Sequence, residues 1–389
     1  MKRSGDQRGA FFGDDDARLA RGYIEDNFGA GAYLAIGLET PDRDEVLIAG
    51  FLSARDYMRQ SEGCNGAGLP LRLFAGLIET IRPNAFATHH RGLHLCGFNT
   101  GLYGAIFELC HFVMAQPGVL KDVGDPAHET GASLPPGIVP GFWMIDQLRS
   151  HGSLRDKTLA PSFMPRCPER ASFAIILTLH MMRFVWFHEL YHCLNGHVGA
   201  LSRHVPSIRL NEMPDDAGLA ALVELEKARL PMGKPAFMQA IELDADRTAL
   251  WAAFRTQIED KENIIALQSL DGRRRISLCL LSAYLITNIF DEAGRRWGQS
   301  ASTHPGSYTR LHNLIRTTAS HLLDADPGVH ATFQEVMREL RALKRSIPAL
   351  VDADRVLADC LSPSFQALLD AADEQLEAAR AYFEAFAFR

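Results

Sequence analysis

The chain has 389 residues, of which 47% are hydrophobic and 22% are charged, and this is the composition of a folded protein rather than of a disordered chain. The net charge of −7 argues against a surface devoted to nucleic acid. No uncharged apolar run reaches the roughly 20 residues that a membrane span needs, and the first residues lack the apolar core of a signal peptide. The 7 cysteines form no C-x-x-C pair, so we expect free thiols, no membrane span and a cytoplasmic location.

The spacing of apolar residues predicts a mainly α-helical protein with at most a small β element. Residues 21–116 hold several helix-length apolar stretches, and the last of these, 101–116, is expected to be a helix. Two short segments, 32–38 and 45–51, fit a strand and an amphipathic helix about equally well. The glycines and prolines in 124–141 predict a loop.

The second half of the chain is predicted to be helical as well. A long apolar helix is expected from about 169 to 200, and another from 235 to 259. A third covers 263–297, with a break at Gly272 left open. Two amphipathic helices are predicted near the end of the chain, at 331–347 and 364–386.

Prolines in residues 150–168 suggest the main boundary of the chain. We predict three regions: a mostly helical N-terminal region at 1–150, a core at 151–325 and a C-terminal helical cap at 326–389.

The motif H-E-x-x-H is the most informative feature of the sequence. It comprises His188, Glu189 and His192 within the long apolar helix. Residues four apart share one face of a helix, so both imidazoles are placed to bind one metal ion, while Glu189 is placed to take a proton from a metal-bound water. Asn195 and Gly196 are expected to end the helix. The alternative is a helix that carries two ordinary histidines.

A catalytic zinc site needs a third protein ligand and an open fourth position. His197 fits badly, because a continuous helix would put it about half a turn away from His188. The metzincin pattern is absent. Glu242 and Asp246, four residues apart on the next predicted helix, offer a carboxylate ligand and an acceptor for the far nitrogen of a ligand histidine. Alone, this pair would be read as a solvated acidic helix face.

These residues resemble the HtpX-like and CAAX-prenyl-protease-like metallopeptidases of the gluzincin clan. HELYHCLNGH is similar to the H-E-x-x-H helix of that group, and ELDAD to its E-x-x-A-D helix. A third segment, STHPGSYTRL, is similar to a loop in which His-Pro is followed by Arg-Leu. The resemblance covers about 170–320. A looser resemblance exists to soluble bacterial and phage-related peptidases, and the spacing alone does not choose between the two.

The resemblance implies two further roles. His304 would stabilise the oxyanion of the reaction, and Arg310 would pair with Asp246 or nearby groups. Their ordinary alternatives are a loop histidine before a proline and a structural salt bridge. The sequence departs from the group at Tyr191, where a small residue is usual, and it lacks the transmembrane helices or signal that many members carry.

From this ligand set we expect a soluble zinc metalloendopeptidase with a zincin-like helical core and one Zn²⁺ per chain, held by His188, His192 and Glu242. Its partner would be a protein or peptide substrate, with no nucleic acid; the sequence gives no oligomeric state. Two alternatives remain: a non-catalytic metal-binding helical scaffold, and a regulatory or host-defence protease with a single dedicated target.

A second group of histidines, His89, His90 and His94, lies in the N-terminal region. His90 and His94 have helical i, i+4 spacing, which leaves a second metal site open. No acidic partner stands at a clear spacing, so a polar loop or a helix end is the preferred interpretation.

Overall fold

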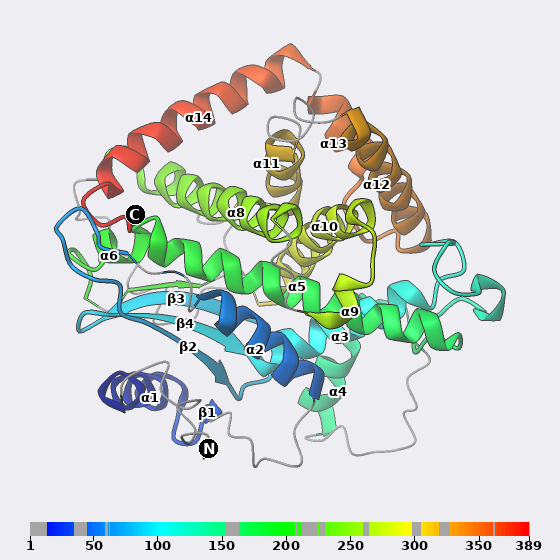
Figure 1. Ribbon diagram of the computed structural model, residues 1–389, viewed down its shortest axis with the longest axis horizontal. Helices are drawn as coiled ribbons and strands as arrows, with labels where there is room; N and C mark the ends of the chain where they lie inside the picture. Colours follow the sequence, from blue (N-terminus) through cyan, green and yellow to red (C-terminus); the bar gives the residue numbers. More distant parts are fainter. Residues whose placement is uncertain are drawn as a thin grey trace, which may run out of the picture.

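The computed structural model describes most of the chain and is mainly α-helical with one small sheet (Figure 1). The described residues are 14–34, 45–58, 61, 63–134, 136–151, 163–206, 208–211, 224–225, 230–259, 264–297, 305–318, 327–360 and 362–388. The helices are α1 (Asp14–Phe28), α2 (Glu45–Met58), α3 (Thr100–Met114), η1 (Pro126–His128), α4 (Trp143–His151), α5 (Pro168–Leu194), α6 (His197–Leu201), α8 (Lys234–Ile258), α9 (Ile265–Gln268), α10 (Gly272–Trp297), α11 (Ser307–Thr318), α12 (Pro327–Ser346), α13 (Ala353–Cys360) and α14 (Pro363–Phe383).

The sheet has five strands in the order β1-β2-β4-β3-β5. They are β1 (Tyr33–Leu34), β2 (Leu73–Ile78), β3 (Ala85–His90), β4 (Leu93–Asn99) and β5 (Arg209–Asn211). Only β2 and β4 pair in parallel; the other neighbours are antiparallel. Arg91 and Gly92 both have positive φ, which is the backbone of the two-residue turn that joins β3 to β4 in a tight hairpin.

Successive residues of the strands enter two separate cores. Leu73, Ala75 and Leu77 of β2 join the large core, whereas Phe74 and Ile78 pack with α1. The sheet therefore lies between α1 on one face and α5 on the other (Figure 1). The large core is continuous and includes residues of all three predicted regions of the chain.

Helix α5 lies at the centre of the protein, packed against α2, α3, α8, α10 and strands of the sheet. These neighbours on every side explain why the sequence of α5 is mostly apolar, because a helix that is buried all round needs no polar face. Near its start, the fully buried guanidinium of Arg170 donates hydrogen bonds to backbone carbonyls at the end of α3 and in the loop after it: those of Met114, Gln116, Val119, Leu120 and Val123.

Most of the predicted helices are present. The helix expected at 101–116 is α3, that at 235–259 is α8, and those at 331–347 and 364–386 are α12 and α14. The third long helix is broken before Gly272, where α10 begins after the short α9. The loop predicted at 124–141 contains only the short η1 among its described residues.

Three strands lie in a region that we expected to be helical. Every residue of β2 and β4 is buried, so these strands read as continuous apolar runs without the alternation that marks a half-exposed strand. Of the two ambiguous segments, 45–51 belongs to helix α2, and 32–38 contributes β1, with 35–38 outside the described residues.

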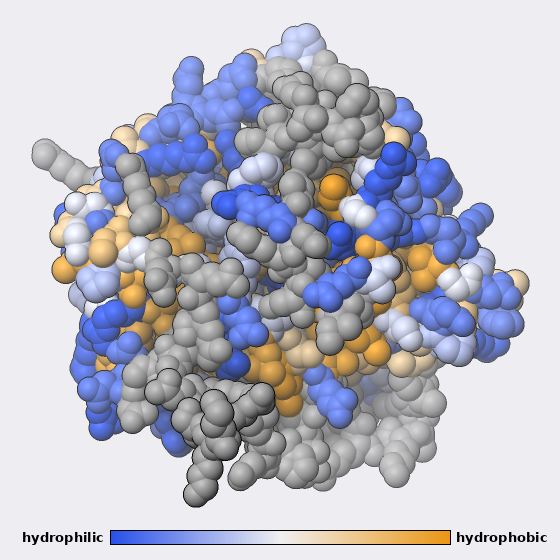
Figure 2. Space-filling model, in the orientation of Figure 1, coloured by the Kyte–Doolittle hydropathy of each residue, from blue (hydrophilic) through white to orange (hydrophobic). Residues whose placement is uncertain are grey.

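Two described helices, α5 and α10, are long and apolar enough to cross a membrane by length and composition alone. Buried residues make up 78% and 89% of their most apolar windows, as is usual for core helices, so the length criterion is weak evidence for a span. Hydrophilic side chains are spread over the face of the protein seen in Figure 2.

Candidate metal centre

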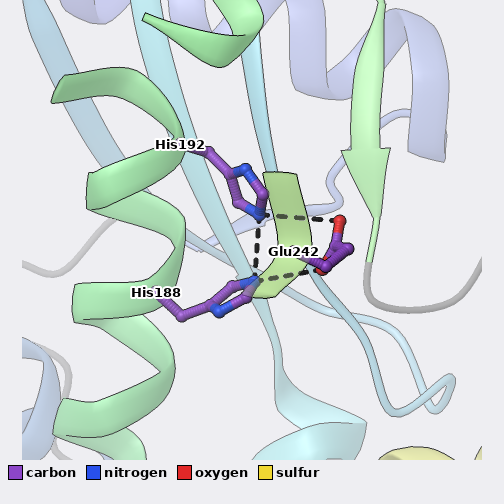
Figure 3. Close-up of side chains that lie close together, drawn as sticks. All are labelled: His188, His192 and Glu242. Carbon is purple, nitrogen blue, oxygen red and sulfur yellow. Dashed lines mark hydrogen bonds and ion pairs between the residues drawn. The ribbon is translucent and has the colours of Figure 1, made fainter. Parts of the chain in front are cut away.

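Three side chains that the sequence singled out converge between α5 and α8 (Figure 3). The Nε2 atoms of His188 and His192 lie 2.9 Å apart. The carboxylate of Glu242 lies 3.4 Å from Nε2 of His188 and 3.7 Å from Nε2 of His192. All three residues are about 1% exposed. Among the described residues, this is the group of histidine and carboxylate side chains placed to hold a metal ion.

The spacing of these atoms fits zinc. Tetrahedral zinc with bonds of about 2.05 Å needs ligand atoms roughly 3.3 Å apart. The two Nε2 atoms are 2.9 Å apart, Oε2 of Glu242 lies 3.4 Å from His188 and Oε1 lies 3.7 Å from His192, and one ligand atom from each residue lies within 4.8 Å of the other two. Two neutral imidazoles and one carboxylate also match the donor set of catalytic zinc. The residues therefore fit the ion that the sequence implied.

The protonation of His192 suits a metal ligand. Burial lowers the pKa of His192 to about 4, although the carboxylate of Glu242 opposes the fall. The imidazole is therefore neutral near pH 7, with a nitrogen lone pair available to a metal.

Asp246 and Arg310 support the other histidine. Nδ1 of His188 lies 3.0 Å from Oδ1 of Asp246, so the proton of His188 sits on Nδ1 and Nε2 faces the centre as an acceptor. Arg310 donates to both oxygens of Asp246, from Nε at 2.7 Å and from Nη2 at 2.6 Å. Burial alone would raise the pKa of Asp246, but Arg310 and His188 outweigh it and hold the pKa below its usual range. The pairing of Arg310 with Asp246 that the resemblance implied is present.

Glu189 follows His188 on α5 and is about 1% exposed. One residue along a helix is a rotation of about 100°, so the side chain of Glu189 leaves α5 in a different direction from that of His188. Glu189 is accordingly not one of the three converging ligands.

The end of α5 differs from a continuous helix in a way that matters for His197. The helix ends at Leu194, as Asn195 and Gly196 predicted, so the extension to about residue 200 was wrong. Gly196 adopts φ of +82°, and residues 197–201 form the separate helix α6. His197 is therefore not placed half a turn from His188 on one helix, because α5 does not continue to it. His197 is not in the ligand group, but its Nδ1 lies 3.0 Å from Nδ1 of His192. Its contact with His192 was not predicted from the spacing of the motif.

The remaining predicted residues are placed as follows. His304 lies outside the described residues. Tyr191, the departure from the family pattern, is partly buried against the large core.

The second histidine group lies on the β3–β4 hairpin, not on a helix. His89 and His94 stand opposite each other across the two strands, with ring centroids 4.7 Å apart. The i, i+4 relation of His90 and His94 was wrong, because the turn at Arg91 and Gly92 reverses the chain between them. None of these three histidines belongs to the candidate metal group found among the described residues.

Comparison with known proteins adds no family. No protein-family model, no curated protein and no solved structure matches this chain.

Proposed function

We propose that this chain is a zinc-dependent metallopeptidase with a zincin-like core, which hydrolyses peptide bonds in a protein or peptide. The observation that carries the proposal is the convergence of His188, His192 and Glu242, whose ligand atoms all lie within 4.8 Å of one another. Glu189 beside them supports an enzyme over a scaffold, since a site that only stores metal needs no general base.

Each residue has a distinct role in this proposal. A zinc ion bound at the site would lower the pKa of water and polarise the scissile carbonyl. His188, His192 and Glu242 would hold it, and Asp246 would keep His188 in the required tautomer. Glu189 would accept the proton of the attacking water and pass it to the leaving amine. His304 would donate to the oxyanion, as the resemblance implies.

The decisive variant is Glu189→Gln, which keeps the size of the side chain and removes the base. We expect it to retain one zinc per chain and to lose hydrolysis of an unfolded protein substrate, as wild type does on addition of a chelator. Glu169→Gln is the matched control, because it is the same substitution at an exposed position of the same helix. Turnover by Glu189→Gln at the wild-type rate would refute the general-base role.

A protease with one dedicated target is the second candidate. The ligand side chains are about 1% exposed, and such burial favours restricted access over general proteolysis. In that case wild type would bind zinc and leave generic substrates intact. A comparison of cellular proteins after expression of wild type and of Glu189→Gln would then reveal a fragment that only wild type produces. This proposal, too, assigns a cytoplasmic enzyme without a membrane span or a nucleic-acid partner.

A further inference from the structure

The two ligand histidines are supported from different sides. His188 contacts its carboxylate, Asp246, directly. Among the described residues, Nδ1 of His192 meets an imidazole rather than a carboxylate, with 3.0 Å between Nδ1 of His192 and Nδ1 of His197. Two imidazole nitrogens at this distance share one proton, so the state of His197 decides which tautomer His192 adopts.

The far side of His197 faces a buried carboxylate. Nε2 of His197 lies 3.2 Å from Oδ2 of Asp244, a residue of α8 that is 2% exposed. The negative charge of Asp244 favours the proton of neutral His197 on Nε2, which leaves Nδ1 as an acceptor. His192 then donates from Nδ1. The lone pair of its Nε2 points to the space between the three ligands, as a metal ligand requires.

Asp244 also accepts hydrogen bonds from two residues on other segments of the chain. Arg380 of α14 donates to Oδ1 from Nη2 at 2.8 Å and from Nε at 3.2 Å, and Asn195 donates to Oδ2 at 2.8 Å. The ring of Phe383, one turn beyond Arg380, packs edge-on against His197 at 4.7 Å between centroids. Helix α14 thus contacts both His197 and Asp244, and the contacts form a series that leads from His192 through His197 and Asp244 to Arg380.

We propose that His197, Asp244 and Arg380 are positioning residues that fix the tautomer and orientation of His192, so that the C-terminal helix α14 sets the metal affinity of the site. The inference rests on the proposed metal centre and gives a defined role to a part of the chain outside the H-E-x-x-H core. It mirrors the series His188, Asp246 and Arg310, with one imidazole inserted.

The test compares zinc affinity across variants by competition with a chromophoric chelator, and measures thermal unfolding of each metal-free protein. His197→Phe keeps a ring against Phe383 but removes the acceptor, and we expect zinc to bind 10- to 100-fold more weakly. His197→Gln offers His192 a carbonyl acceptor again and should recover most of that loss. The absorption spectrum of bound Co²⁺ should shift in His197→Phe, because the orientation of one ligand changes.

Arg380→Met tests the outer end at a site that tolerates change, since the Arg380 side chain is 41% exposed and borders a surface pocket. Its matched control is Asp373→Asn, which removes the ion pairs of α14 with Arg247 of α8 and with Arg316 of α11 and leaves His197, Asp244 and Arg380 unchanged. We expect several-fold weaker zinc binding in Arg380→Met and wild-type binding in Asp373→Asn.

Unchanged zinc affinity in His197→Phe would overturn the positioning role, as would equal losses in Arg380→Met and Asp373→Asn, which would reflect general docking of α14. Either result leaves the proposed protease standing. Wild type that binds no zinc would overturn both proposals. If the variants lose zinc while wild type cleaves neither the unfolded substrate nor any cellular protein, the positioning role is supported and the protease is refuted.

Discussion

The buried pair of Asp246 and Arg310 allows a quantitative prediction. Asp246 is fully buried and Arg310 is 2% exposed, and the two are joined by two short charge-assisted hydrogen bonds. Removal of one partner leaves the other charge buried without its counterion, which costs about 3–5 kcal/mol. We therefore expect Asp246→Asn and Arg310→Met each to lower the free energy of unfolding by that amount.

The double variant should differ sharply from the sum of the single ones. With both charges of this pair removed, neither is left buried without its counterion. We therefore expect the double variant to lose no more stability than either single variant. The assay is urea denaturation of the metal-free protein, which separates this effect from metal binding. Zinc affinity of Asp246→Leu, a variant that offers Nδ1 of His188 no acceptor, should fall about 10- to 100-fold in a parallel measurement, because the tautomer of His188 is no longer fixed.

The control is a second ion pair on the same helix. Arg316 of α11 lies 3.4 Å from Asp370, but Asp370 is 68% exposed. Such a pair contributes below about 1 kcal/mol, so Asp370→Asn should have little effect. A loss in Asp246→Asn as small as that in Asp370→Asn, or strictly additive losses in the double variant, would refute the reasoning.

Three further predictions concern stability. Burial lowers the pKa of His94 to about 3, so below pH 6.5 the unfolded chain binds a proton that the folded protein excludes. The free energy of unfolding should therefore fall as the pH falls from 6.5 to 3, by about 2 kcal/mol at pH 5. Urea titrations at pH 7.5 and 5 measure this loss, which should be smaller in His94→Phe. Gly196→Ala should cost at least about 1–2 kcal/mol in the same assay, because φ is +82° and an added Cβ would lie 2.7 Å from the backbone of Ala387; a neutral effect would contradict the close approach. Arg170→Met should cost at least about 3 kcal/mol, since it strips donors from several buried carbonyls, whereas the exposed Arg166→Met should be silent in thermal unfolding.

The candidate site was largely predictable because its signal is local. The spacing of His188 and His192 and that of Glu242 and Asp246 are properties of single helices, and a helix brings residues four apart to one face wherever it lies. The carboxylate contact of His188 followed from the same geometry.

The support of His192 was not predictable from spacing. His197 reaches His192 because Gly196 reverses the chain after α5, and Arg380 comes from a helix remote in the sequence. The strands β2 and β4 were missed for a different reason, since burial on both faces removes the alternation by which a strand is recognised. The turn at Gly196 is local, but packing between segments distant in the sequence determines the contact of Arg380 and the burial of both faces of these strands.

The most direct test of the account is the zinc content of the purified protein, measured by mass spectrometry on wild type and on Glu242→Ala. We predict about one zinc per wild-type chain and a sharp reduction in Glu242→Ala, because only two of the three converging ligands remain. A wild-type protein that stays free of metal after zinc is added back would contradict the metal centre, and the proposed hydrolysis with it.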